Sequence, residues 1–262
     1  MSPVVGAATQ AVRRSTRFVA WVRAWRAGLV PYDLAAEEIE ADEEHVAVDA
    51  PGTWTDIPLR DALSALSKLH PDEIRLVLPA PGDPRGLPGP GTPFTGAALM
   101  AGEGVLAGPY GLVPEVRTHT SGSGDVFITV GWQFFPVPGA AGARTHEATP
   151  AEAESDLSAA LADATAALVR LDVAQWRPEL ASALSALRRR DDGGELPPGY
   201  DLRARRLFAR ANLLDRVLAL AEQVAPGGAV NLLEAQRRDE ALRPLLSACR
   251  RALVAACNAP LI

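Results

Sequence analysis

The stretch LVPEVRTHTSGSGDVFITVGWQFF, residues 112–135, decides the fold of this chain. Its two arms, residues 112–120 and 125–135, are rich in β-branched and aromatic residues, and the glycines of the SGSG connection allow a tight turn. In the second arm the large apolar residues alternate strictly with the others: Val126, Ile128, Val130, Trp132 and Phe134. That alternation predicts a β-hairpin with one face against a core. Pro114 places the first strand at an edge of the sheet, or lies near that strand's start.

The residues before this hairpin predict the rest of a small sheet. HVAVD at residues 45–49 and IRLVLP at residues 74–79 are typical of strands. Between them, residues 58–69 carry leucines on one helical stripe: Leu59, Leu63, Leu66 and Leu69. We expect a βαβ unit here, with the second strand parallel to the first through a right-handed crossover. A short helix around residues 95–100 and a strand at residues 105–107 complete a sheet of about four or five strands.

Residues 4–29 predict one amphipathic helix with apolar residues at helical spacing and arginines largely on the opposite side. Two interpretations are open: a surface helix with a solvated cationic face, or a basic helix that binds an anionic membrane or a partner. Six acidic residues then fall within residues 37–44. They predict a solvated edge, a face turned toward the cationic side of the first helix, or oxygen ligands for a hard cation.

From residue 149 onward the sequence predicts helices. TPAE at residues 149–152 combines a cap, a proline at the first helical position and a capping-box glutamate. Further helices are expected over residues 178–190, over residues 200–224, and from residue 231 to residue 257, the last one kinked or split by Pro244. Four helices with short connections can pack as a bundle or cover a sheet.

Charge and cysteine usage exclude several classes of protein. The net charge of −6 argues against a general nucleic-acid binder, which needs a positive field. No apolar run reaches the length of about 18 residues that a transmembrane helix needs. Arginines interrupt the apolar stretch that a signal peptide would require, so we expect a cytoplasmic protein. Cys249 and Cys257 lack metal-binding spacing and predict buried, inert thiols.

No catalytic motif stands out in the sequence. A Walker A loop, GxSxG, HExxH and a strand-linked GxGxxG are all absent, and no two histidines lie within five residues of each other. His119 is expected at the exposed hairpin tip, where Asp125 could orient its ring across the turn. We expect no catalytic residues, no metal site and no cofactor, which favours a protein that is not an enzyme.

The glycine- and proline-rich loop from Pro79 to Gly104 is the candidate ligand site. It follows a strand expected to be parallel, and ligands of open parallel sheets bind beyond the carboxyl ends of strands. An arginine with nearby backbone N–H groups can hold a carboxylate or a phosphate. The candidate residues supply close backbone approach, one charge of each sign and two hydroxyls: Gly82, Asp83, Arg85, Gly86, Thr92 and Thr95. The alternative is a rigid connector in which Asp83 and Arg85 pair locally.

Three segments carry a resemblance to known proteins: LVLPAPGDPRGLPGPG, GEGVLAGPYGLVPEV and VGWQFFPVP. Set in a background poor in lysine and rich in alanine and arginine, they resemble conserved proteins of unknown function that are restricted to actinobacteria. The similarity covers residues 30–140, with the helical tail expected to follow. The resemblance implies a cytoplasmic bacterial protein and brings no assigned catalytic residues.

Together these patterns predict an α+β or α/β fold: a small mixed sheet with a βαβ unit and a β-hairpin, flanked by helices, plus a C-terminal helical region. We expect an α/β region over residues 1–148, including the N-terminal amphipathic helix, and an all-helical region over residues 149–262 that packs on the same core or forms its own. The favoured function is a non-enzymatic interaction or regulatory protein. The alternative is a small-molecule, anion-binding protein or enzyme that uses the glycine- and proline-rich loop. The expected partner is an unknown protein or a small anionic ligand, and no nucleic acid is expected. The sequence leaves open whether the protein forms a homo-oligomer.

Overall fold

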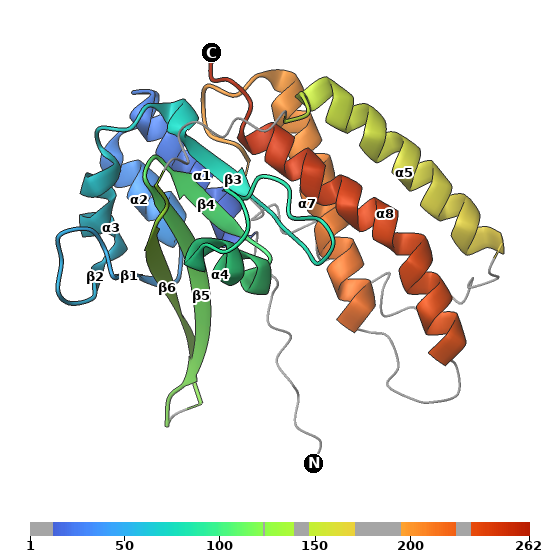
Figure 1. Ribbon diagram of the computed structural model, residues 1–262, viewed down its shortest axis with the longest axis horizontal. Helices are drawn as coiled ribbons and strands as arrows, with labels where there is room; N and C mark the ends of the chain where they lie inside the picture. The colour runs from blue at the N-terminus through green and yellow to red at the C-terminus, as the bar shows by residue number, and fades with distance from the viewer. Residues whose placement is uncertain (1–12, 123, 139–146, 171–194, 224–231) are drawn as a thin grey trace.

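The computed structural model describes residues 13–122, 124–138, 147–170, 195–223 and 232–262. In this part of the chain, a mixed sheet of six strands lies beside three long C-terminal helices (Figure 1). The expected class is therefore confirmed: an α+β protein with a small mixed sheet, flanking helices and a helical C-terminal region.

The strands are arranged in the order β2-β1-β6-β5-β4-β3. Each neighbouring pair is antiparallel except β1 and β6, which are parallel. A two-residue strand at one edge, β2, brings the sheet beyond the expected size. The bounds are β1 Glu44–Val48, β2 Ile57–Pro58, β3 Ile74–Val77, β4 Gly104–Ala107, β5 Tyr110–Thr120 and β6 Val126–Pro136.

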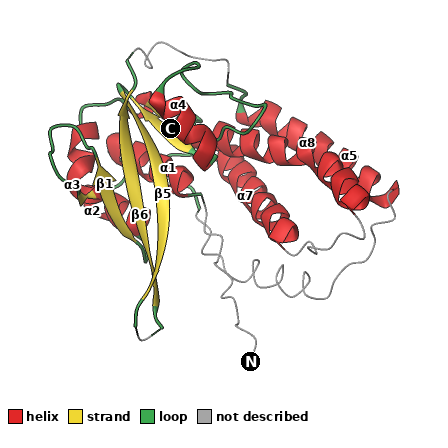
Figure 2. Ribbon diagram, turned by 60° about the horizontal axis from the view of Figure 1, so that its bottom comes forward, coloured by secondary structure: helices red, strands yellow, loops and turns green. Residues whose placement is uncertain are grey.

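The hairpin of β5 and β6 is confirmed, and its register runs from Thr120 opposite Val126 to Tyr110 opposite Pro136. Its alternating face is buried progressively: Val126 is 64% exposed, whereas Val130 and Trp132 are fully buried. The tip projects beyond the rest of the sheet and the helices that cover it (Figure 2). Pro114 lies in β5 just past the residues that pair with β4, so its missing N–H falls on a local edge.

The expected βαβ unit was wrong. The two strands expected in this unit correspond to β1, which lies near one edge of the sheet, and β3, which lies at the opposite edge and is antiparallel to β4. The parallel position beside β1 is taken by β6, which pairs with all five residues of β1. The leucine-rich segment between β1 and β3 does not form one helix. It divides into α3 (Leu59–Ala62) and a 3-10 turn, η1 (Leu63–Leu66), and a second 3-10 turn, η2 (Pro71–Glu73), follows. Leu59, Leu63 and Leu66 of this segment are buried. So short a helix cannot cross the sheet to a parallel neighbour.

The first helix, α1 (Arg14–Arg26), is buried rather than laid on the surface. Phe18, Val19 and Val22 are fully buried, and even the side chain of Arg23 is 1% exposed. The helix packs against α2 (Tyr32–Glu40), β3 and α8 (Leu232–Cys257), so most of its circumference faces protein. The expected solvated cationic face was wrong for the described turns of this helix, and no such face is available to a membrane.

The short helix predicted around residues 95–100 is α4 (Pro93–Ala101), and it covers the face of the sheet opposite to α1. Thr92 caps it by accepting a hydrogen bond from the Thr95 backbone N–H at 3.1 Å. The Phe94 ring lies directly on β5 at Gly111, where a Cβ atom would come within 2.2 Å of the ring. Only glycine permits this close approach, so Gly111 sets the distance between α4 and the sheet.

The C-terminal region contains α5 (Pro150–Arg170), α7 (Leu202–Gln223) and α8. The capping box at the start of α5 is confirmed, because the Thr149 N–H donates to Glu152 and the Glu152 N–H donates to the Thr149 hydroxyl. Pro244 lies inside α8 without ending it. The helix predicted over residues 178–190 lies outside the described residues.

One hydrophobic core joins the sheet to the C-terminal helices. Phe18 of α1 and Trp132 of β6 belong to the same buried cluster as Leu157 of α5, Leu207 of α7 and Leu253 of α8. Cys249 and Cys257 are both free and buried in it, as predicted. Burial raises the pKa of Cys249 to about 12 and that of Cys257 further, so both stay as thiols at neutral pH.

Candidate functional site

A chain of buried hydrogen bonds leads from the core to the surface at the start of β1. His45 pairs with Val130 of β6 in the sheet, and its ring lies beside Trp132. The Trp132 indole Nε1–H donates to His45 Nδ1 at 3.0 Å. Because Nδ1 accepts this bond, the network assigns the proton of the neutral imidazole to Nε2.

At its outer end this series of hydrogen bonds reaches Glu43. His45 Nε2 lies 3.4 Å from a Glu43 carboxylate oxygen, and Arg14 of α1 donates to the same carboxylate through Nε at 3.0 Å and through Nη2. Burial alone would raise the pKa of Glu43, but the hydrogen bonds from His45 and Arg14 outweigh it and lower the pKa to about 2. The acidic stretch therefore does face the cationic side of the first helix, one of the arrangements expected from the sequence.

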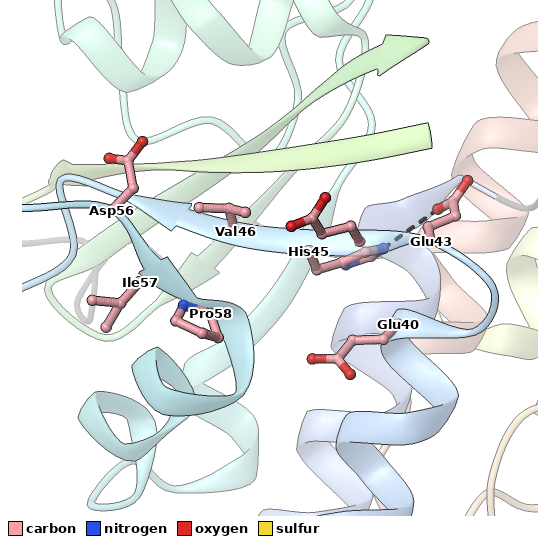
Figure 3. A pocket seen from close by; sticks show the side chains of 8 residues that line it. Glu40, Glu43, His45, Val46, Asp56, Ile57 and Pro58 are labelled. Carbon is pink, nitrogen blue, oxygen red and sulfur yellow. Dashed lines mark hydrogen bonds and ion pairs between the residues drawn. The ribbon is translucent and has the colours of Figure 1, made fainter. Parts of the chain in front are cut away.

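Beside these residues lies an open cleft of about 350 Å³ (Figure 3). It is formed by the end of α2, the start of β1, and the β2 strand with the residue before it. Four carboxylates line it together with one histidine and three other residues: Glu40, Glu43, Glu44 and Asp56, with His45, Val46, Ile57 and Pro58. Glu40 accepts hydrogen bonds from Arg60, whereas Glu44 and Asp56 are exposed to solvent. The cleft therefore keeps a surplus of negative charge toward solvent.

A fully exposed tryptophan lies two residues before Asp56 of this cleft. Trp54 precedes Asp56 by two residues in the loop between β1 and β2, and its side chain has no burial in the protein. The loop is held by the Thr53 N–H and hydroxyl, which both donate to the Ala50 carbonyl. An anchored loop thus presents a large, exposed indole ring two residues along the chain from the exposed Asp56.

The side chains of the cleft suit the binding of a positively charged group. None of its eight lining residues is a serine, threonine, cysteine or lysine. His45 cannot act as a base through Nδ1, because that atom already accepts from Trp132. No group of three or more potential metal ligands is assembled within the described ranges. The arrangement can attract and hold a cation through carboxylate oxygens and an aromatic face.

The structure also places the six candidate residues of the glycine- and proline-rich loop. Asp83 and Arg85 form a bidentate pair, with Arg85 Nε 2.6 Å and Nη2 2.9 Å from the Asp83 carboxylate. Gly82 and Gly86 flank this pair with φ values of 80° and 82°, conformations that favour glycine. Thr92 and Thr95 lie at the start of α4 instead, where their hydroxyls bond to each other and Thr95 bonds to the Gly89 carbonyl. The six residues thus form two separate groups.

The positional argument for this loop was wrong, because β3 is an antiparallel edge strand and not a parallel one. The loop instead contacts α8. Ser247 of α8 donates to Asp83 at 3.1 Å and accepts from Arg251 at 3.0 Å. The sequence reasoning missed these α8 residues. Their spacing of four residues, which places them on one helix face, is the signal that could have pointed to them.

The hairpin tip does not contain the expected histidine–aspartate pair. The His119 ring stacks on Phe127, with 4.8 Å between centroids, and the Asp125 N–H bonds to the Ser121 hydroxyl. The sequence reasoning also missed the connection between His45 and Trp132, which lie 87 residues apart. The two residues lie on adjacent strands only because β1 inserts beside β6.

Fold and cleft together define an α+β protein with an acidic surface cleft. Residues 15–148 match the family described as "Rv1486c-like protein, N-terminal domain", and residues 151–254 match "Rv1486c-like protein, C-terminal domain". The chain belongs to this Rv1486c-like family.

Similar proteins come from mycobacteria, which confirms the resemblance to actinobacterial proteins. The chain is 32% identical to "Uncharacterized protein Rv1486c" of Mycobacterium tuberculosis, an alignment that covers 91% of this chain and 94% of the relative. It is 26% identical to "Uncharacterized protein ML1804" of Mycobacterium leprae over the same shares of both chains. No solved structure matches the chain significantly. No helix in the described residues is long and apolar enough to span a membrane.

Proposed function

We propose that this protein is a non-enzymatic interaction protein that binds an arginine-containing segment of a partner protein in the acidic cleft. The observation that carries the proposal is a fully exposed tryptophan, Trp54, only two residues along the chain from Asp56, an exposed carboxylate of the cleft. Tryptophan is enriched among the residues that dominate binding energy at protein interfaces. The proposal keeps the cytoplasmic location expected from the sequence.

The charges of the cleft favour a guanidinium over other groups. Glu43 and Glu40 are already bonded to Arg14 and Arg60. The carboxylates without an arginine partner among the described residues are Asp56 and Glu44, and Glu44 accepts one bond from the Thr129 hydroxyl at 3.4 Å. A planar guanidinium can donate two hydrogen bonds to a carboxylate and stack on an indole face at the same time, which an ammonium cannot do equally well. Lysine-containing segments are therefore expected to bind more weakly than arginine-containing ones.

The test is isothermal titration calorimetry, in which the full chain is titrated with a short peptide of alternating arginine and glycine. We expect Trp54→Ala to raise the Kd at least about tenfold, as removal of an interface anchor does. Asp56→Asn should raise the Kd by a smaller factor and reduce its dependence on salt, because the exposed charge is screened. A lysine–glycine peptide of equal length tests the preference for guanidinium.

Two matched controls remove the same chemistry elsewhere. Met100→Ala removes a side chain that is 89% exposed on α4, and Asp163→Asn removes an exposed carboxylate on α5. Neither should change the affinity for the peptide. Equal affinity of wild type, Trp54→Ala and Asp56→Asn would remove the cleft from any role in binding.

A further inference from the structure

A cluster of arginines surrounds Asp83 where the glycine- and proline-rich loop meets α8. Asp83 holds Arg85 in the bidentate pair and accepts from Ser247, which in turn accepts from Arg251. Ser247, Arg250 and Arg251 stand three and four residues apart, so they lie on one face of α8. Arg85 and Arg251 are thus connected through Asp83 and Ser247, and Arg250 is close enough to Asp83 to be attracted by its charge.

The loop is built to hold Arg85 in this position. Gly86 has a positive φ, and a Cβ atom there would come within 3.0 Å of a Val77 methyl group on β3. The Ala80 and Asp83 backbones bond to each other in both directions and close the turn. The Arg85 side chain nevertheless stays 63% exposed, so its outer N–H groups remain open to solvent.

Positive charge exceeds negative charge around Arg250 even when its neighbours Arg13 and Asp215, which pair with each other, are counted. Asp83 is the acidic group bonded to Arg85, and the nearest carboxylate oxygen to Arg251 belongs to the exposed Asp156, 4.0 Å away. The Arg250 Nε–H is buried and has no hydrogen-bond partner among the described residues. Burial lowers the pKa of Arg250, against the attraction of Asp83 and Asp215. A buried N–H without an acceptor is unfavourable, and because Arg250 as a whole is only partly buried, an anion at the surface can pair with its charge.

We infer that Arg85, Arg250 and Arg251 form a binding site for a phosphate group, as free phosphate or as part of a small molecule. Guanidinium forks match phosphate oxygens in geometry and charge. Asp83 is the internal counter-ion that keeps Arg85 in place when the site holds no anion. The site shares no residue with the acidic cleft, and its success or failure is independent of the proposed partner binding.

The experiment is a thermal-shift titration of the full chain with inorganic phosphate, against chloride at equal ionic strength. We expect phosphate to raise the Tm above the chloride control. Arg85→Ala and Arg250→Gln should each raise the apparent Kd for phosphate roughly tenfold to a hundredfold, the range for charge-assisted hydrogen bonds. Asp83→Asn should lower it, because the competing carboxylate is gone.

The chain offers a close control for Arg85. Arg117 pairs in the same bidentate way with an acidic residue two positions earlier, Glu115, and its side chain is 65% exposed. Arg117→Ala should leave phosphate binding unchanged, and so should Trp54→Ala. Equal phosphate shifts in wild type, Arg85→Ala and Arg250→Gln, or no shift beyond chloride, would overturn the inference. Since Arg85 is exposed, its variant tests the site even if Arg250→Gln fails to fold.

Two further ligands distinguish the source of the phosphate group. Glycerol phosphate and ADP carry the same group on a polyol and on a nucleotide. Equal apparent affinities for all three ligands support a site for the phosphate group alone. Tighter binding of either ester, lost in Arg85→Ala, supports the same site with contacts to the rest of the molecule.

Discussion

The side-chain amide of Asn258 pairs with both backbone polar groups of Leu76. The Leu76 N–H donates to Asn258 Oδ1 at 2.8 Å, and Asn258 Nδ2 donates to the Leu76 carbonyl at 3.1 Å. Leu76 belongs to β3, the edge strand, and Asn258 directly follows α8. The amide therefore takes the place of a further strand, which closes part of an edge that could pair with another chain.

Replacing Asn258 tests how strongly this contact ties the C-terminal helices to the sheet. Asn258→Ala leaves two backbone groups of a buried strand without partners, so we expect a loss of about 1–3 kcal/mol in the free energy of unfolding. Urea unfolding followed by circular dichroism measures it. Gln133→Ala is the control, since it removes an exposed amide that bonds to Asp49. Equal losses in the two variants would mean that the pairing with Leu76 adds little.

Arg23 makes a second connection between the two regions. Its guanidinium donates to the carbonyls of Cys257 and Pro71 and to the Asp72 carboxylate, while the Tyr200 hydroxyl donates to the same Cys257 carbonyl. A cation at the end of α8 also suits the helix dipole.

Arg23→Met should therefore destabilise the fold strongly, by about 3–5 kcal/mol, because the buried acceptors lose their donor. The midpoint of urea unfolding measures the effect. Arg26→Met, on the same helix, removes one bond to the Leu69 carbonyl from a less buried side chain and should cost much less. A smaller loss for Arg23→Met than for Arg26→Met would contradict this assignment.

Local patterns in the sequence were enough to predict some elements and not others. The β5–β6 hairpin follows from alternation and a glycine turn, which lie within one stretch of chain. The partner of β1 could not be read in this way, because β1 and β6 are far apart in the sequence and nothing near β1 specifies its neighbour. The α1 prediction located a helix, but the burial of Arg23 depends on acceptors in η2 and α8.

The candidate sites follow the same rule. The acidic stretch and the Asp83–Arg85 pair were visible as local patterns, and the structure supplies their partners from elsewhere. Arg14 reaches Glu43 from α1, and Ser247 reaches Asp83 across 164 residues. Those partners decide which charges remain available to a ligand, and no local pattern predicts them.

Glu43 should make the protein sensitive to acid. Its pKa is about 2 in the folded state and near the ordinary 4.5 in the unfolded chain. Its contribution to stability is therefore complete above pH 4.5 and is lost as the pH falls toward 2. Glu43→Gln lacks this contribution, so its deficit relative to wild type should shrink on acidification. Urea unfolding at a series of pH values measures the difference, and a deficit independent of pH would exclude Glu43 as its source.

Glu103 should have the opposite effect. Its side chain is partly buried, and its carboxylate accepts the Ser15 N–H at 2.8 Å at the start of α1. Burial raises its pKa above the ordinary value of 4.5, against the hydrogen bond from Ser15 and the attraction of Arg13. The folded state therefore keeps its proton after the unfolded chain has released it, and stability falls as the pH rises above 4.5 through the folded pKa.

Glu103→Gln can still accept from Ser15 and carries no charge. We expect the variant to gain stability relative to wild type as the pH rises through this window, measured by urea unfolding at each pH. Because Glu43→Gln loses stability relative to wild type over rising pH, opposite slopes in the two variants separate these carboxylates from a general response of the protein to acid. A Glu103→Gln difference that falls with rising pH would show that the Arg13 attraction outweighs burial.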